Sequence, residues 1–466
     1  MNLPESDHPS LKGLMVGKGE LADRFISDGD ILVKFEQLHL GSCFADLKKF
    51  RGLSVLILTA RQYTAAVALL ELDGVARRIV LAPTGLEPSY IGQVLVDGSV
   101  DVILTDYPLS NGYDNVEVVE FNGEVVLTED EVVRSESTEW LLFTSGTTGR
   151  PKLVIHTLQS LIGPLQNQPP RSKSPVWGTF YDIRRYGGLQ ILLRAFVGGG
   201  SIVLSDPRES IRQFITRAGE SGVSHISGTP SHWRGVLMSG GIGAFKPEYV
   251  RLSGEIADQA ILDGLCVVFP EACISHAFAS TEAGVGFEVR DGLEGFPAAW
   301  IGSDLGGVEL LVVNGSLRIR SLRTGAGYAG AQLVSFAGPD DFVDTGDIVE
   351  RRHDRYYFVG RREGIINVGG YKVYPEEVEA IVNLHPSVQM SRVQARSSPI
   401  TGAIVTANVV VKIGADLHEG GFGKVRQEIL QTCRERLPSY KVPALLYQVP
   451  HLDIAPSGKL LRRPHA

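Results

Sequence analysis

The chain has 466 residues, of which 43% are hydrophobic and 21% charged, so it can bury a large core spread over more than one domain. Its formal net charge of −8 argues against a general binder of nucleic acid or anionic membranes. The four cysteines form no CxxC pair, the first ten residues show no basic region followed by an apolar run, and no apolar run reaches roughly 18 residues. We therefore expect a soluble cytoplasmic protein with no nucleic-acid or membrane partner.

The first third of the chain predicts a parallel α/β unit. Apolar runs of strand type alternate with segments of helical spacing, with strands at 53–60, 76–82 and 100–106 and helices at 62–72 and 89–97. Strands that alternate with helices in this way form parallel β-α-β units. A polar connection over 107–138 then leads to a strand that runs directly into a glycine-rich segment.

A second α/β stretch spans about 177–290, and the pattern then changes to hairpins over 302–361, with Asn-Gly and His-Asp turn signals. A compact unit of helix, strand and helix follows. We expect an α/β protein. Its large N-terminal domain, residues 1–361, would contain two parallel α/β subdomains and a small β-barrel-like part, and residues 362–466 would form a small α+β C-terminal domain.

The most informative segment is FTSGTTGRPK, residues 143–152. It is not a Walker A loop, because Lys152 does not directly follow the last glycine. Its hydroxyl groups and exposed backbone N–H groups could still wrap the oxygens of a polyphosphate. A polar glycine-rich hairpin without a ligand is the alternative.

TSGTTGRPK resembles the signature loop of the adenylate-forming superfamily, which contains acyl- and aryl-CoA ligases, amino-acid adenylation domains and luciferases. Further motifs of that family follow in the expected order, so the resemblance covers nearly the whole chain. It implies that the loop holds the β- and γ-phosphates of ATP, with Thr148 also taking part in catalysis. The implied loop contacts are Thr144, Ser145, Gly146, Thr147, Thr148, Gly149 and Lys152.

Phe278 to Glu282 resembles the family's Tyr-Gly-x-Thr-Glu motif. The resemblance implies that Phe278 stacks on adenine, that Ser280 and Thr281 line the nucleotide site, and that Glu282 binds Mg²⁺ and acts in catalysis. A hard cation held by one carboxylate and phosphate oxygens fits this chemistry. The alternative is that Phe278 is an ordinary core residue and that Glu282 begins a helix.

Two later residues complete the implied nucleotide site. Asp347 lies in a Thr-Gly-Asp motif whose carboxylate binds both ribose hydroxyls in the family, and a carboxylate can accept two such hydrogen bonds. Arg361 matches a second ribose or phosphate contact. Thr-Gly-Asp by itself is a common turn, so its weight comes from its position.

The last motifs imply a mobile C-terminal domain. Glu363 stands at the hinge position, where the family usually has Asp or Lys, and PSGKLLR places Lys459 as the adenylation lysine. A lysine on a mobile loop can neutralise charge as pyrophosphate leaves. By resemblance, rotation about Glu363 then withdraws Lys459 and brings Gly369 and Gly370 beside a thiol tunnel. A solvated basic tail is the alternative for the segment around Lys459.

The implied reaction uses ATP, Mg²⁺ and a thiol, most simply CoA. Attack of a carboxylate on the α-phosphate gives an acyl-adenylate and pyrophosphate, and AMP then leaves when the thiol attacks. The acid would be a small aryl or short acyl acid. Alternatives are a free-standing enzyme that loads an amino or acyl acid onto a carrier-protein phosphopantetheine, and a catalytically silent nucleotide-binding regulator. We expect a monomer or homodimer.

For the acid pocket the sequence leaves alternatives open. Tyr186 is the preferred gating aromatic, because Arg185 would be an unusual replacement there. Asp182 keeps an amino-acid substrate open, although a structural ion pair with Arg184 is the commoner use of such neighbours. Glu255 stands where the family commonly has a small residue. The candidate pocket residues are Asp182, Arg185, Tyr186, Gly188, Gly254 and Glu255.

Overall fold

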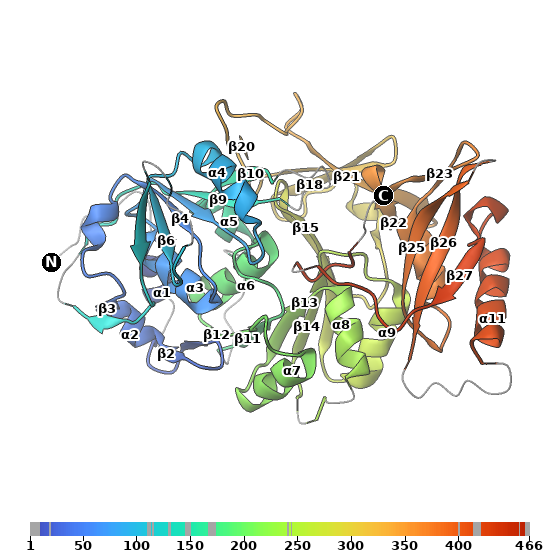
Figure 1. The fold of residues 1–466 in the computed structure, drawn as a ribbon, viewed down its shortest axis with the longest axis horizontal. Coiled ribbons are helices and arrows are strands. Elements are labelled where there is room, and N and C mark those ends of the chain that lie inside the picture. Colours follow the sequence, from blue (N-terminus) through green and yellow to red (C-terminus); the bar gives the residue numbers. More distant parts are fainter. Residues whose placement is uncertain are drawn as a thin grey trace.

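A computed structural model gives the fold (Figure 1). It describes residues 10–17, 20–109, 113, 116–128, 132–144, 151–165, 174–239, 242–243, 245–398, 401–412, 421–455 and 457–461. Over these residues the chain forms two large mixed sheets, a five-stranded antiparallel sheet and a smaller C-terminal unit. None of the described helices is long and apolar enough to cross a membrane.

The first large sheet is the predicted parallel unit, extended by an antiparallel edge. Its strand order is β20-β10-β9-β5-β4-β6-β7, and the strands from β9 to β7 are parallel. β10 and β20 add to this edge in the antiparallel direction. The strands are β4 (Ser54–Ile57), β5 (Arg78–Leu81), β6 (Val102–Thr105), β7 (Glu117–Glu120), β9 (Glu139–Phe143), β10 (Leu153–Thr157) and β20 (Gly327–Tyr328).

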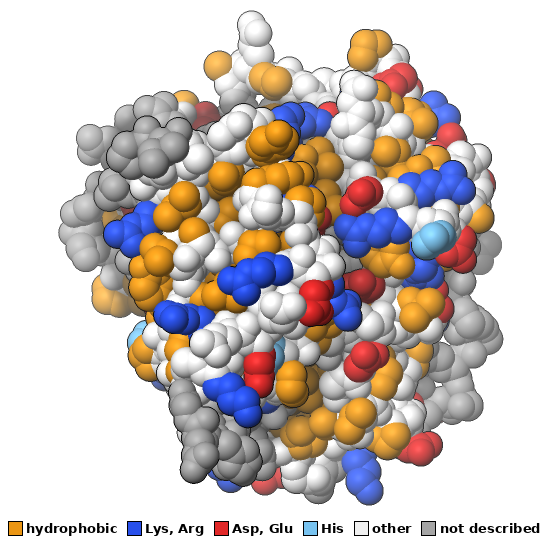
Figure 2. All heavy atoms as spheres, turned by 90° about the vertical axis from the view of Figure 1, so that its right-hand side faces the viewer, with side chains coloured by type: hydrophobic (Ala, Val, Ile, Leu, Met, Phe, Trp, Pro, Cys, Tyr) orange, Lys and Arg blue, Asp and Glu red, His pale blue; other side chains and the backbone are white. Residues whose placement is uncertain are grey.

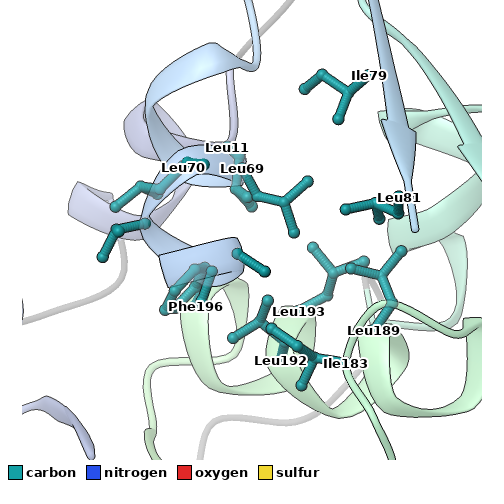
Figure 3. Close-up of a cluster of buried hydrophobic side chains, with 14 of the residues drawn as sticks. Leu11, Leu69, Leu70, Ile79, Leu81, Ile183, Leu189, Leu192, Leu193 and Phe196 are labelled. Carbon is teal, nitrogen blue, oxygen red and sulfur yellow. The ribbon is translucent and has the colours of Figure 1, made fainter. Parts of the chain in front are cut away.

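The helices of this unit match their predictions closely. α3 spans Gln62–Leu72 and α4 spans Pro88–Asp97. Every residue of α3 is buried, because the helix is covered by the sheet on one side and by α1 (Leu11–Val16) and α6 (Tyr186–Val197) on the other. Figure 3 shows side chains of α1, α3, β5 and α6 converging in one apolar cluster. This cluster joins the two α/β subdomains into one body.

The second large sheet has the order β16-β15-β14-β13-β11-β12-β1-β2, with antiparallel strands at both edges. Its strands are β1 (Phe25–Ser27), β2 (Leu32–Lys34), β11 (Val176–Thr179), β12 (Ser201–Leu204), β13 (His225–Gly228), β14 (Tyr249–Ser253), β15 (Cys273–Ser280) and β16 (Gly284–Val289). The connecting helices are α7 (Ile211–Glu220), α8 (Pro230–Met238) and α9 (Gln259–Val268). Because β13 and β14 are parallel, the residues that follow them meet at one edge, where ligands bind in such sheets.

The predicted hairpins form the five-stranded sheet, in the order β17-β22-β21-β19-β18. Its strands are β17 (Phe296–Pro297), β18 (Val308–Val313), β19 (Ser316–Ser321), β21 (Val343–Arg352) and β22 (Arg355–Arg361). Asn314 and His353 both adopt positive φ, 52° and 56°, in the two turns that the sequence predicted. Bridges from Ile301 and Asp304 to β18 bring the segment after β17 round to the opposite edge, which gives the sheet its barrel-like form.

The C-terminal unit has its own hydrophobic core, formed by residues from Ile366 to Leu446. A three-stranded sheet in the order β25-β26-β27 packs against two helices. Its elements are β23 (Ile366–Val368), β24 (Tyr371–Val373), α10 (Pro375–Val382), β25 (Val388–Ser398), β26 (Gly402–Val411), α11 (Gly421–Arg436) and β27 (Leu445–Gln448). Figure 2 shows the face of the molecule on this side, where basic and acidic side chains are interspersed.

Short elements complete the described fold. They are α2 (Phe35–Leu40), β3 (Gly41–Ser42), β8 (Val126–Leu127) and α5 (Leu158–Ile162). After β27 the chain turns back, and its last described residues lie over α8 and the end of β14 in the middle of the molecule (Figure 1).

Candidate active site

The glycine-rich loop connects two antiparallel strands at the edge of the first sheet. Thr144 N–H donates to the carbonyl of Lys152 over 3.0 Å and closes the connection between β9 and β10. Ser145, Gly146, Thr147, Thr148 and Gly149 lie outside the described residues, so their phosphate contacts stay predictions. The structure fixes the two ends of the loop, at Thr144 and Lys152.

Glu282 is tied to the end of this loop through Tyr328. The Tyr328 hydroxyl donates to Glu282 Oε1 over 3.1 Å, and the Lys152 ammonium lies 4.8 Å from the centroid of the Tyr328 ring. Glu282 occupies a turn between β15 and β16, so the alternative that it begins a helix is wrong. Within the described chain, no three His, Cys, Asp or Glu side chains form a metal-binding group. Mg²⁺ therefore fits here only with phosphate oxygens beside this carboxylate.

His156 holds the turn between β15 and β16 in place. Its Nε2 lies 2.7 Å from the carbonyl oxygen of Thr281, and its Nδ1 lies 2.9 Å from Ser160 Oγ. Burial lowers the pKa of His156 to about 4, so the ring is neutral at physiological pH. Ser280 Oγ accepts from Ala283 N–H over 2.9 Å and closes the turn. Neither His156 nor Tyr328 belongs to a motif that sequence reasoning could have recognised.

Phe278 packs against the core of the five-stranded sheet. Its ring stacks on Phe358 at 5.3 Å and on Phe287 at 5.7 Å, and those two rings are 6.4 Å apart. Phe278 is nevertheless only partly buried, so part of its side chain stays accessible. The core alternative and the adenine-stacking prediction are thus compatible.

Asp347 and Arg361 lie opposite each other on β21 and β22. Arg361 Nε is 3.8 Å from Asp347 Oδ1, and Arg361 Nη2 donates to the carbonyl of Thr345 over 3.0 Å. Burial raises the pKa of Asp347 to about 6, although Arg361 and Lys459 oppose the change. Arg361 and Glu363 also act electrostatically on Tyr328, which links this pair to Glu282.

Lys459 belongs to the segment 457–461, which is hydrogen-bonded to residues that follow β13 and β14. The Thr229 hydroxyl donates to the carbonyl of Gly458 over 2.6 Å, and Leu460 N–H donates to Glu255 Oε1 over 2.7 Å. A Cβ placed on Gly254 would lie 3.4 Å from Lys459 Cε. Burial lowers the pKa of Lys459, while Glu255 opposes this. Residues 457–461 are therefore docked, and the alternative of a solvated tail is wrong for them.

Gly458 shows how close this docking is. Its φ is +75°, and a Cβ there would lie 1.9 Å from the His232 ring. Gly369 and Gly370 are instead in the turn between β23 and β24, where a Cβ on Gly370 would meet nothing within 4 Å. In this structure Lys459 is therefore docked beside Gly254, whereas Gly369 and Gly370 take no part in the contacts around Lys459.

The expected pocket residues divide into two groups. Asp182 accepts from Arg184 Nε over 2.7 Å and from Thr84 N–H over 2.8 Å, so both of its oxygens are used inside the protein. Burial alone would raise the pKa of Asp182, but Arg184 holds this pKa below its usual range. This corrects the option that Asp182 holds a substrate ammonium. A Cβ on Gly188 would lie 2.3 Å from the carbonyl oxygen of Asp182, so Gly188 serves packing.

Tyr186, preferred over Arg185 as the gating aromatic, and Arg185 itself lie in different surroundings. Tyr186 is 4% exposed and packs in the core, with its ring centroid 5.5 Å from that of His156. Arg185 acts electrostatically on Lys459, and its buried Nε has no hydrogen-bond partner in the described part of the chain. Arg185 is therefore the residue of this pair that borders the Lys459 site. Glu255, expected in the acid pocket, instead binds backbone N–H groups.

Two family models match the chain. The model of the AMP-binding enzyme matches residues 63–325, which is more than half of the chain, and that of the AMP-binding enzyme C-terminal domain matches residues 377–459. The chain belongs to the AMP-binding enzyme family. The predicted membership of the adenylate-forming family is thereby confirmed.

Individual relatives of this AMP-binding enzyme include acid–CoA ligases. The 2-succinylbenzoate–CoA ligase of Bacillus licheniformis is 27% identical, over 98% of this chain and 99% of the relative. That of Listeria innocua is 29% identical, over 69% of this chain and 68% of the relative. Surfactin synthase subunit 1 of Bacillus subtilis is 23% identical over 86% of this chain, which spans only 12% of that relative.

Solved structures have the same fold as this AMP-binding enzyme. The anthranilate CoA ligase AuaEII in complex with anthranoyl-AMP has a TM-score of 0.80 at 17% identity, over 98% of this chain and 97% of that chain. The o-succinylbenzoate CoA synthetase of Bacillus subtilis, in complex with the acyl-adenylate intermediate, has a TM-score of 0.73 at 20% identity, over 96% of each chain. The predicted fold, a large N-terminal domain with a small C-terminal domain, is confirmed.

Proposed function

We propose that this AMP-binding enzyme activates an aromatic carboxylic acid with ATP and transfers the acyl group to CoA. The observation that carries the proposal is that Lys459 is docked by Thr229 and Glu255 within electrostatic range of Asp347 and Arg361, the predicted ribose site. A lysine and a diol-binding carboxylate in one place suit a nucleotide whose α-phosphate is attacked. No side-chain nucleophile is needed, because the reactants need only be aligned and their charge stabilised.

In the first step a carboxylate oxygen of the acid bonds to the α-phosphorus, and the bond from that phosphorus to pyrophosphate breaks. Lys459 supplies positive charge beside the phosphates, and Lys152 lies at the end of the loop that would hold them. Glu282 and the phosphate oxygens would together hold Mg²⁺, which supplies further charge neutralisation when bound. In the second step the thiol sulfur bonds to the acyl carbon and AMP leaves.

The acid is proposed from the relatives and from Arg185. The names of the 2-succinylbenzoate and anthranilate CoA ligases specify aromatic acids, which supports the expected small aryl acid over a short acyl acid. The free Nε of Arg185 beside the Lys459 site would suit an acid with a second anionic or acceptor group. We therefore place Arg185, rather than Tyr186, at the mouth of the acid pocket.

Carrier-protein loading is the second candidate. The match of 86% of this chain to part of surfactin synthase subunit 1 favours it specifically. Either acceptor requires the rotation that would move Lys459 away and bring Gly369 and Gly370 in, which stays a prediction with Glu363 as its hinge. The domain boundary after Arg361, the cytoplasmic location and the monomeric or homodimeric state also stay predictions.

The test is pyrophosphate exchange across a panel of carboxylic acids, with thioester formation then measured on CoA and on a carrier protein. We expect exchange with an aromatic acid and a thioester on CoA. Arg185→Gln should reduce the preference for acids with a second anionic group by about tenfold or more, the value of one charge-assisted hydrogen bond. Clear ATP binding without pyrophosphate exchange on any acid would instead support the alternative of a catalytically silent nucleotide-binding regulator.

A further inference from the structure

Glu255 connects the large domain with the segment that carries Lys459. Its Oε1 accepts from Leu460 N–H over 2.7 Å, and its Oε2 accepts from Ser231 N–H over 2.9 Å. Ser231 is in the first turn of α8, so one oxygen is anchored to a helix that packs firmly on the second sheet. The other oxygen holds the residue directly after Lys459. One carboxylate thus spans the contact between the two parts.

We propose that Glu255 is a positioning residue that holds Lys459 in place for acyl-adenylate formation, and that these hydrogen bonds open before the thiol reacts. The inference rests on the proposed function, because it assigns Glu255 to one of its two half-reactions. The carboxylate is suited to this role by its two oxygens, one for each backbone donor. A small residue at this position would leave both N–H groups without this acceptor.

The surroundings of Glu255 make the position of Lys459 specific. Glu255 also acts electrostatically on the Lys459 ammonium, so it holds the segment by its backbone and attracts the side chain toward Gly254. Thr229 adds the second hydrogen bond to the segment, at Gly458. Thr229 and Glu255 follow the parallel strands β13 and β14, and the docked segment lies over the ends of both.

These hydrogen bonds are specific to one arrangement of the C-terminal segment. If Lys459 withdraws for the second half-reaction, Leu460 N–H must leave Glu255. A hydrogen bond to a charged acceptor is among the stronger ones, so its loss shifts the balance between the two arrangements by about tenfold or more. Weakening the bond should therefore slow acyl-adenylate formation and leave the thiol step unchanged or faster. A purely structural residue would affect both steps alike.

The kinetic test compares Glu255→Ala with Glu294→Ala. Glu294 is a matched control, since its Oε2 accepts from Gln259 N–H at the start of α9 over 3.1 Å and does not contact the C-terminal segment. For Glu255→Ala we expect about tenfold or more loss in pyrophosphate exchange, with thioester formation from supplied acyl-adenylate retained. Glu294→Ala should leave the ratio of the two rates unchanged. Equal losses in both steps for Glu255→Ala would overturn the proposal.

A second measurement needs no substrate. Hydrogen exchange at the Leu460 amide, followed in the nucleotide-free protein, should be at least about tenfold faster in Glu255→Ala, with α9 amides unchanged. Glu255→Gln keeps the shape and one acceptor oxygen, so it should show a smaller change in the same direction even if the alanine variant folds poorly. Unchanged exchange at Leu460 in both variants would overturn the inference. Failure of the proposed function would appear separately, as wild-type protein without pyrophosphate exchange.

Discussion

Arg361 Nε lies 3.8 Å from Asp347 Oδ1 across the β21–β22 pair, too far for a hydrogen bond but close enough for attraction. The Asp347 carboxylate therefore has lone pairs to offer a ribose diol. The pKa of this carboxyl is nevertheless raised to about 6 by burial. The surrounding protein therefore stabilises the Asp347 anion only in part.

Asp347→Asn should separate binding from stability. A raised carboxyl pKa contributes stability that is present below the unfolded value of 3.8 and is lost as pH rises through about 6. At pH 7 the variant should therefore unfold at the same or a higher temperature without nucleotide, while its ATP affinity falls by about tenfold to a hundredfold. Wild-type ATP affinity should also fall as pH decreases below 6. Calorimetry and thermal unfolding check both, with the exposed Asp354→Asn as control.

Lys459→Ala should separate the two half-reactions. Removing the charge that Lys459 places beside Gly254 should lower pyrophosphate exchange by about a hundredfold or more. Thioester formation from supplied acyl-adenylate should be largely retained. Lys424→Ala removes an exposed lysine of α11 and should alter neither rate. A variant that loses both steps equally would argue against two working arrangements of the C-terminal domain.

Glu282→Gln should raise the Mg²⁺ concentration needed for half-maximal pyrophosphate exchange by about tenfold or more, because a carboxylate ligand becomes a neutral amide. Tyr328→Phe is the comparison, since it removes the 3.1 Å hydrogen bond to Glu282 but keeps the carboxylate. We expect a much smaller shift for it. A magnesium titration that gives identical curves for wild type and Glu282→Gln would remove Glu282 from the metal site.

Asp182→Asn should damage stability and leave acid preference unchanged. It would leave the buried Arg184 guanidinium without its anion, at a cost of about 3 kcal/mol in the free energy of unfolding. Asp206 and Arg208 have the same spacing and the same 2.7 Å distance, but Arg208 is exposed to solvent, so Asp206→Asn should change the free energy of unfolding far less than Asp182→Asn. Denaturant unfolding measures both. If Asp182→Asn altered amino-acid activation without a change in stability, the result would support binding of a substrate ammonium by Asp182.

The range predicted for α3, residues 62–72, matches the structure. Every residue of α3 is buried, so the helix has no polar face; its length and its Ala and Leu residues, which are strong helix formers, favour a helix over a strand. β1 and β2 were missed because three-residue strands carry almost no periodic signal. β25 was missed as well, since polar residues interrupt its apolar positions.

In the candidate site, too, some residues could be predicted from the sequence and others could not. Asp347 and Arg361 lie opposite each other in the structure, and Lys459 is within electrostatic range of both; the roles that the resemblance implies for these motif residues stay predictions. Asp182 and Glu255 were placed in the acid pocket, but their actual partners are Arg184 in one case and Leu460 in the other. The contact between Glu255 and Leu460 joins residues 205 positions apart, and no local pattern encodes such a contact.

The pairing of β1 with β12 has a consequence for how the chain can be divided. Ile26 is the register partner of Ile202, so the second sheet contains a strand made before the whole first sheet, while β20 returns to the first sheet from beyond the second. During synthesis β1 cannot pair with β12 until more than 170 further residues have been added to the chain. Cutting the chain between the sheets would leave each fragment short of a strand carried by the other. Only mixing the two fragments could rebuild both sheets, which makes this enzyme a candidate for split-protein complementation.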